Sequence, residues 1–131
     1  MIDAMLAEVN VVPSIVCEVL DKLGLQKGEI MFLFKKIPSI SIKELERKLT
    51  EKIVLIDVRE PNEFRNGHIL SAKNIPLNKI GNYKPKTEVY VICQSGMRSK
   101  AATKKLINAG YDAINVKGGM LAWNGSIKGG N

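Results

Sequence analysis

Cysteine and aromatic residues are scarce in this chain of 131 residues, which has two Cys, three Phe, three Tyr and one Trp. The two cysteines, Cys17 and Cys93, do not make a disulfide framework, and such sparse usage is typical of a reducing cytoplasm. Few rings are available for base stacking, and the lysines are scattered along the chain. We therefore expect no nucleic-acid partner.

Long apolar runs and a secretory signal are also missing. No run approaches the ~18 apolar residues that a membrane-spanning helix needs. Asp3 and Glu8 occupy positions where a secretory signal would carry Lys or Arg. These features predict a cytoplasmic protein without a membrane span.

The remaining composition is ordinary for a globular protein, with 45% hydrophobic and 25% charged residues. The charge is distributed unevenly. Residues 1–30 hold five acids and two bases (net −3), whereas residues 31–131 hold eighteen bases and eight acids (net +10). A basic domain attracts anionic substrates and acidic partners.

We divide the chain into an N-terminal helical extension, residues 1–37, and an α/β domain, residues 38–131. An apolar stripe from Ile15 to Leu23, followed by Gly24, predicts a helix in the extension. This helix either packs on the domain or binds a partner, and the sequence leaves both interpretations open. The glycine-containing tail, residues 128–131, is expected to be a mobile chain end.

Apolar, β-branched runs alternate with helical segments in the domain. The strongest runs are 53–56, 89–92 and 113–116. Ser41 and Glu44 have the spacing of a capping box, which begins one helix, and Gly110 is placed to end another. Strands that alternate with helices predict a parallel sheet with right-handed crossovers.

The run 89–92 ends at Cys93, and a short loop then leads through Gly96 and Arg98 to Ser99, the expected N-cap of the next helix. Loop amides, a helix N-terminus and a nearby Arg lower the pKa of a thiol from its usual ~8.5. Gly96 permits a positive φ, and Arg98 can bind two oxygens of an anion. A strand-end cysteine can also be a plain buried hydrophobe. The Gly and the Arg at loop spacing favour a reactive thiolate instead.

This loop resembles the active-site loop of single-domain rhodaneses, the thiosulfate sulfurtransferase-like family. The loop consists of Cys93, Gln94, Ser95, Gly96, Met97, Arg98 and Ser99. Two further stretches match in the right order, LIDVRE to AKNIP at 55–76 and VKGGMLAW at 116–123. The resemblance extends over residues 38–128. One departure is Gln94, because many members carry a basic residue directly after the cysteine.

The resemblance implies a rhodanese-like five-stranded parallel sheet with helices on both faces and Cys93 at the carboxyl edge of the central strand. It also implies sulfur transfer. Cys93 would take the outer sulfur of a small anionic donor such as thiosulfate and pass it to a thiol or cyanide acceptor, and a thiol protein would be one form of acceptor. The loop residues 94–99 would bind the substrate. This chemistry requires no metal and no organic cofactor.

Asp57 and Arg59 follow a predicted strand, and two interpretations fit them equally well. They are either neighbours of the Cys93 pocket or a structural ion pair. His68, the single histidine, is expected to be structural, because a thiolate already stabilised by its loop needs no base.

Two alternatives to a sulfurtransferase remain. Phosphatases and arsenate reductases of the same fold place five residues between Cys and Arg, whereas this loop places four, Gln94 to Met97, which disfavours that chemistry. A non-catalytic binding or sulfur-relay module is the second alternative. Degenerate rhodanese domains usually lose the cysteine, which this chain retains.

Overall fold

The computed structural model describes Lys22, Gly24 and residues 37–131. Of the extension, Lys22 is helical, and Gly24, which follows the predicted helix, has a left-handed φ of 74°. The rest of the predicted helix, including Cys17, lies outside the described residues. The boundary between extension and domain therefore stays a prediction.

Five strands form one parallel sheet in the order β1-β5-β4-β2-β3, with β4 in the centre. The strands are β1 (Ser39–Ile40), β2 (Val54–Asp57), β3 (Ala72–Asn74), β4 (Val89–Ile92) and β5 (Ala113–Val116). The predicted rhodanese-like α/β architecture is confirmed.

The helices follow the local signals of the sequence. They are α4 (Ile42–Lys48), α5 (Pro61–Arg65), the 3-10 helix η1 (Leu77–Asn82), α6 (Met97–Asn108) and α7 (Gly119–Ala122). Ser41 and Glu44 form the expected capping box of α4, and Pro61 begins α5. Gly110, with a φ of 96°, ends α6, and the N–H of Tyr111 donates to the carbonyl of Leu106 as in a Schellman stop.

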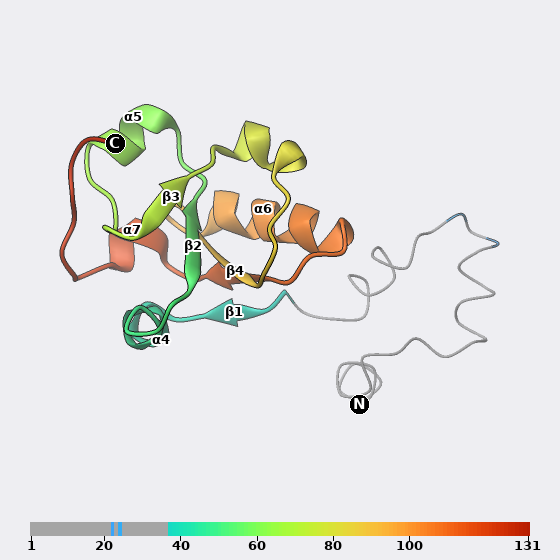
Figure 1. Cartoon of the computed structure of the whole chain (residues 1–131), viewed down its shortest axis with the longest axis horizontal. Helices are drawn as coiled ribbons and strands as arrows, with labels where there is room; N and C mark the ends of the chain where they lie inside the picture. The colour runs from blue at the N-terminus through green and yellow to red at the C-terminus, as the bar shows by residue number, and fades with distance from the viewer. Residues whose placement is uncertain (1–21, 23, 25–36) are drawn as a thin grey trace.

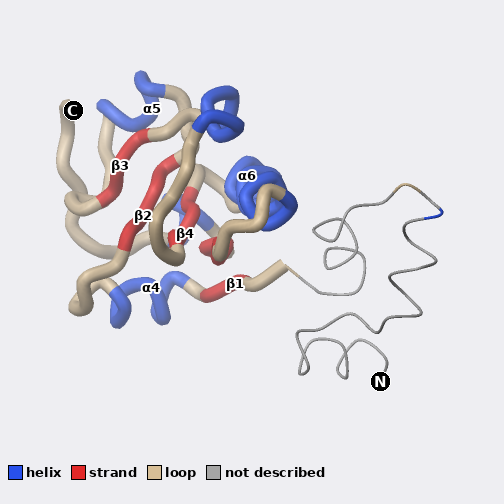
Figure 2. The backbone as a smooth tube through the Cα atoms, turned by 45° about the vertical axis from the view of Figure 1, so that its right-hand side comes forward, coloured by secondary structure: helices blue, strands red, loops and turns tan. Residues whose placement is uncertain are grey.

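Helices lie on both faces of the sheet (Figures 1 and 2). Alternating side chains of β4 build the core on both of these faces. Val89, Val91 and Cys93 join the cluster under η1 and α6. Tyr90 and Ile92 join the cluster on the opposite face, which α4 and α7 supply with Leu45, Met120 and neighbouring residues. Cys93 therefore continues the buried row that faces α6. This packing holds the Cys93 side chain on the α6 face of the sheet.

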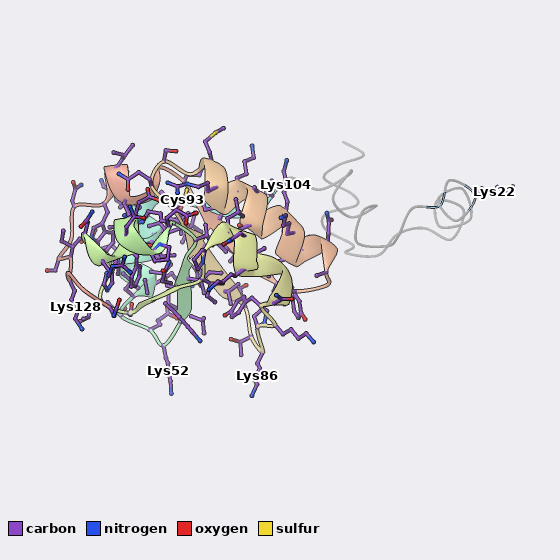
Figure 3. The ribbon with its side chains drawn as sticks, turned by 90° about the horizontal axis from the view of Figure 1, so that it is seen from above. Lys22, Lys52, Lys86, Cys93, Lys104 and Lys128 are labelled. Carbon is purple, nitrogen blue, oxygen red and sulfur yellow. The ribbon has the colours of Figure 1, made fainter. Side chains whose placement is uncertain are left out.

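The carboxyl ends of β2 and β4 lie side by side, because Asp57 is in register with Ile92. Cys93 follows directly, so the loop after β4 and the residues after β2 share one edge of the sheet. Figure 3 shows Cys93 at the edge opposite Lys52 and Lys86, which precede the two strands. Among the described residues, no helix has both the length and the apolar character to cross a membrane.

The C-terminal segment is bonded to the domain, in contrast to the mobile end that its composition predicts. Lys128 and His68 exchange two backbone hydrogen bonds, of 2.9 and 2.8 Å, and the N–H of Gly130 donates to the carbonyl of Arg65. Backbone pairing of this kind needs no particular side chain, so the sequence carries no sign of it. His68 itself is buried, and its ring stacks on the ring of Phe64. Its Nδ1 is hydrogen-bonded to the backbone carbonyl of Phe64 at 2.7 Å. These contacts fit the structural role predicted for His68.

Candidate active site

The sulfur of Cys93 lies at the focus of the loop between β4 and α6. The residue is fully buried. The N–H of Gly96 donates to Sγ at 3.0 Å, and Sγ lies 3.3 Å from the hydroxyl oxygen of Ser99. Gly96 has a φ of 103°, the left-handed conformation that the sequence predicts for it. The loop therefore wraps around one atom.

Helix α6 begins at Met97, with Gly96 as its N-cap, so the prediction of Ser99 as N-cap was wrong. The left-handed turn at Gly96 lets the helix begin three residues earlier than an N-cap at Ser99 would imply. Ser99 is then the third residue of the helix and faces inward, fully buried. Its position brings both its hydroxyl and its N–H to the sulfur.

The Ser99 hydroxyl can serve either protonation state of Cys93. When the thiol is protonated, its S–H donates to Ser99 Oγ, and the hydroxyl donates to the carbonyl of Gly96 at 3.1 Å. When the thiol ionises, the hydroxyl can rotate and donate to the sulfur instead, because hydroxyl hydrogens turn freely about their bond. Such a rotation stabilises the anion without moving any heavy atom.

Two opposing effects set the pKa of Cys93. Burial raises the pKa of its thiol, because the anion loses solvation. Hydrogen bonds from the Ser99 hydroxyl and from the N–H groups of Ser99, Gly96 and Ser95 lower it, and together they outweigh burial. The pKa of Cys93 is therefore lowered from its ordinary value, which favours a reactive thiolate.

Arg98 is engaged by a carboxylate from another helix. Its two terminal nitrogens donate to the two carboxylate oxygens of Glu63, at 2.6 and 2.9 Å. The hydrogen bonds from Arg98, against an opposing effect of burial, lower the pKa of Glu63 from an ordinary 4.5 to about 2. The same pairing raises the pKa of Arg98, and the charge of Cys93 adds to this increase. Both terminal nitrogens with which Arg98 could bind an anion are therefore bonded to Glu63.

Asp57 and Arg59 form an ion pair that also contacts the loop. The Asp57 carboxylate accepts three side-chain hydrogen bonds from Arg59, the shortest at 2.8 Å, and both residues are buried. The remaining terminal nitrogen of Arg59 donates to the side-chain oxygen of Gln94 at 3.2 Å. The two interpretations of this pair are therefore compatible. The pair is buried, and Arg59 also contacts the loop through Gln94.

Helix α7 fixes the start of the loop from the other side. The N–H of Met120 donates to the carbonyl of Cys93 at 2.8 Å, and the N–H of Leu121 donates to that of Gln94 at 3.0 Å. A Cβ on Gly119 would lie 2.4 Å from the Cys93 carbonyl oxygen, so only glycine permits this approach. Gly119 belongs to the matching stretch 116–123, but no local pattern in the sequence indicates this contact.

A groove of about 650 Å³ lies beside the loop. Its lining residues come from the β2–α5 region, the loop, and the α7 segment with the residues that follow; they are Arg59, Glu63, Asn66, Gly67, Gln94, Met120, Trp123, Asn124, Gly125 and Ile127. Large apolar side chains stand exposed nearby, with Met97 76% and Leu121 71% exposed. Within the described part of the chain, no cluster of His, Cys, Asp or Glu has the geometry to hold a metal ion.

Comparisons with known proteins identify the family and the fold. The profile of the Rhodanese-like domain matches residues 41–126. A Bacillus subtilis protein described as uncharacterized, YqhL, is 48% identical over 82 residues, which are 59% of this chain and 65% of YqhL. The putative sulfurtransferase YtwF of the same organism is 38% identical over 99 residues, 71% of this chain and 96% of YtwF.

A solved structure shares the fold. The Rhodanese-like domain protein of Staphylococcus aureus superposes with a TM-score of 0.65 at 33% identity, covering 72% of this chain and all of the other. Family profile, relatives and fold lead to one conclusion. The chain belongs to the rhodanese-like domain family of sulfurtransferase-related proteins.

Proposed function

We propose that the protein is a sulfurtransferase that carries sulfane sulfur from thiosulfate, or a similar donor, to a thiol or cyanide through a persulfide on Cys93. The observation that carries the proposal is the convergence of N–H and O–H donors on the Cys93 sulfur. Family membership and the names of relatives support sulfur transfer as the general chemistry.

In the first step, the Cys93 thiolate attacks the outer sulfur of thiosulfate. A new S–S bond forms on Cys93, the S–S bond of the donor breaks, and sulfite leaves with its electron pair. The persulfide then carries the negative charge on its outer sulfur. The loop N–H groups that stabilise the thiolate are in place to stabilise this anion as well.

In the second step, an acceptor attacks the outer sulfur of the persulfide. Cyanide becomes thiocyanate, or a thiolate becomes a new persulfide, and the electron pair of the broken S–S bond returns to Cys93 as thiolate. The cycle then starts again. No metal or organic cofactor enters either step.

Access to the sulfur requires movement of the loop. Cys93 has no exposed surface, and it is not among the residues that line the groove. Contact between Sγ and a donor therefore requires the loop residues Gln94 to Met97 to shift outward. Exposed Met97 and Leu121 beside the loop give a thiol protein an apolar surface to contact, so such a protein is a second form of acceptor. A reducing cytoplasm suits a cycle that needs a free thiol.

Mass spectrometry after incubation with thiosulfate tests the proposal. The intact protein is expected to gain one sulfur atom and to lose it on addition of cyanide. Cys93→Ser should prevent the gain, whereas Cys17→Ser should leave it intact. If the wild-type protein gains no sulfur, or if Cys93→Ser still gains it, the assignment is wrong and a non-catalytic binding module becomes the better interpretation.

A further inference from the structure

The two arginines beside the loop are both paired with carboxylates. Arg59 is bound by Asp57, and Arg98 is bound through both terminal nitrogens by Glu63. Among the residues that line the groove, the charged ones are Arg59 and Glu63. A donor in the groove therefore meets the carboxylate of Glu63. The guanidinium of Arg98, which could bind the donor, is already bonded to that carboxylate.

Glu63 is held firmly enough to compete with a donor for Arg98. Its Oε1 accepts the N–H of Glu60 at 3.0 Å as part of the α5 cap, and the same oxygen accepts from Arg98. The Glu63 side chain is 30% exposed and the Arg98 side chain 35%. The pair is thus anchored at one end and still open to solvent, so a bound anion can exchange with it. The Asp57–Arg59 pair, with exposures of 0% and 5%, does not have this opening.

We propose that Glu63 determines donor specificity by occupying Arg98, and so disfavours doubly charged donors relative to singly charged ones. This inference rests on the proposed sulfur transfer through Cys93. Thiosulfate is a dianion, whereas an aryl thiosulfonate such as benzenethiosulfonate offers the same sulfane sulfur with one negative charge. In both cases the sulfane sulfur forms a bond to Cys93, and the leaving sulfite or benzenesulfinate keeps the electron pair.

The substitution Glu63→Gln removes the negative charge of the side chain and nearly preserves its size and shape. The glutamine keeps an oxygen that can accept the Glu60 N–H, but it removes one negative charge from the groove and releases Arg98. Charge-assisted hydrogen bonds from Arg98 to the donor then become available, and we expect kcat/KM for thiosulfate to rise about tenfold. Because Coulomb energy scales with the charge of the donor, the monoanion should gain about half as much in free energy, which is about threefold.

The experiment measures thiocyanate formation with excess cyanide, at fixed ionic strength, for both donors. Wild type, Glu63→Gln and Glu46→Gln are compared, because Glu46 is an exposed residue of α4 and its variant has the same charge change. The ratio of kcat/KM for thiosulfate to that for benzenethiosulfonate should rise about threefold in Glu63→Gln and remain constant in Glu46→Gln. In the variant Glu63→Gln with Arg98→Gln, this gain in the ratio should disappear.

A second variant covers the case in which Glu63→Gln does not fold. Glu63→Asp withdraws the carboxylate from Arg98 by one methylene and should shift the ratio in the same direction by a smaller factor. Equal changes for both donors, or a lower ratio in Glu63→Gln, would overturn the role of Glu63 while leaving sulfur transfer intact. If wild type takes sulfur from neither donor, the proposed function fails and the role of Glu63 fails with it.

Discussion

The two arginine–carboxylate pairs at the site differ in burial. We infer from this difference that one pair supports the fold and that the other is open to a ligand. The Asp57–Arg59 pair is buried and bonded to Gln94 and to the carbonyl of Gly67. The Glu63–Arg98 pair joins α5 to α6 and remains about one-third exposed. Desolvated charges are costly to separate, whereas exposed pairs contribute little net stability. The buried pair therefore holds the frame of the loop, and the open pair is free to respond to a ligand.

Breaking the buried pair should have the largest effect. Asp57→Ala leaves the Arg59 guanidinium buried without its carboxylate, and we expect the free energy of unfolding to fall by about 3–5 kcal/mol. Glu63→Ala should cost less than about 1 kcal/mol. Urea denaturation of both variants measures the difference. Equal losses would remove the distinction between the two pairs.

The contact between α7 and the loop should come next in size. In Gly119→Ala, the added Cβ meets the Cys93 carbonyl, and the φ of 57° disfavours a side chain. The combined strain should lower the free energy of unfolding by about 2–4 kcal/mol and reduce sulfur transfer as well. Gly81→Ala is the matched control, because nothing lies within 4 Å of a Cβ there. A loss of stability without a change in the reactivity of Cys93 would contradict the coupling of α7 to the loop.

Ser99→Ala tests the hydroxyl bound to the sulfur. Its removal should raise the pKa of Cys93, because burial then meets weaker opposition. Alkylation by iodoacetamide should therefore slow severalfold near neutral pH and recover at high pH, where the thiol is ionised in both proteins. Ser95→Ala keeps its backbone N–H and should preserve the wild-type pH profile. Identical profiles for Ser99→Ala and wild type would show that the hydroxyl does not stabilise the thiolate.

The smallest effect concerns pH and the open pair. The pKa of Glu63 in the fold is about 2, below its ordinary 4.5, so the carboxylate contributes its stability above about pH 4.5 and loses it as the pH falls through about 2. The difference in unfolding free energy between wild type and Glu63→Gln should be below about 1 kcal/mol at pH 6, since the pair is partly exposed. It should shrink steadily between pH 4.5 and 2. A difference that grows with acidity would have the wrong sign for an ion pair.

Local sequence signals predicted the individual strands, the Cys93 loop and the positive φ of Gly96, because each depends on residues close together in the chain. The five-stranded arrangement, which pairs distant strands, was implied by the family resemblance. The Glu63–Arg98 pair was missed because it joins residues 35 positions apart. From the sequence, Arg98 was expected to bind a substrate anion beside the sulfur. Nothing in the sequence shows that its guanidinium binds the carboxylate of Glu63 instead. Ser99 was misplaced for a related reason. A serine before a helix resembles an N-cap, and only the turn at Gly96 shows that the helix has already begun.

The hydrogen bonds from Met120 and Leu121 to the start of the loop have a consequence for biosynthesis. A chain is made from its N-terminus, so Cys93 and α6 emerge before α7 exists to bind the carbonyls of Cys93 and Gln94. Until α7 docks, the carbonyls of Cys93 and Gln94 lack these two N–H donors, so the start of the loop lacks its second anchor. The position of the residues around the Cys93 sulfur therefore depends in part on one of the last segments of the chain to be made.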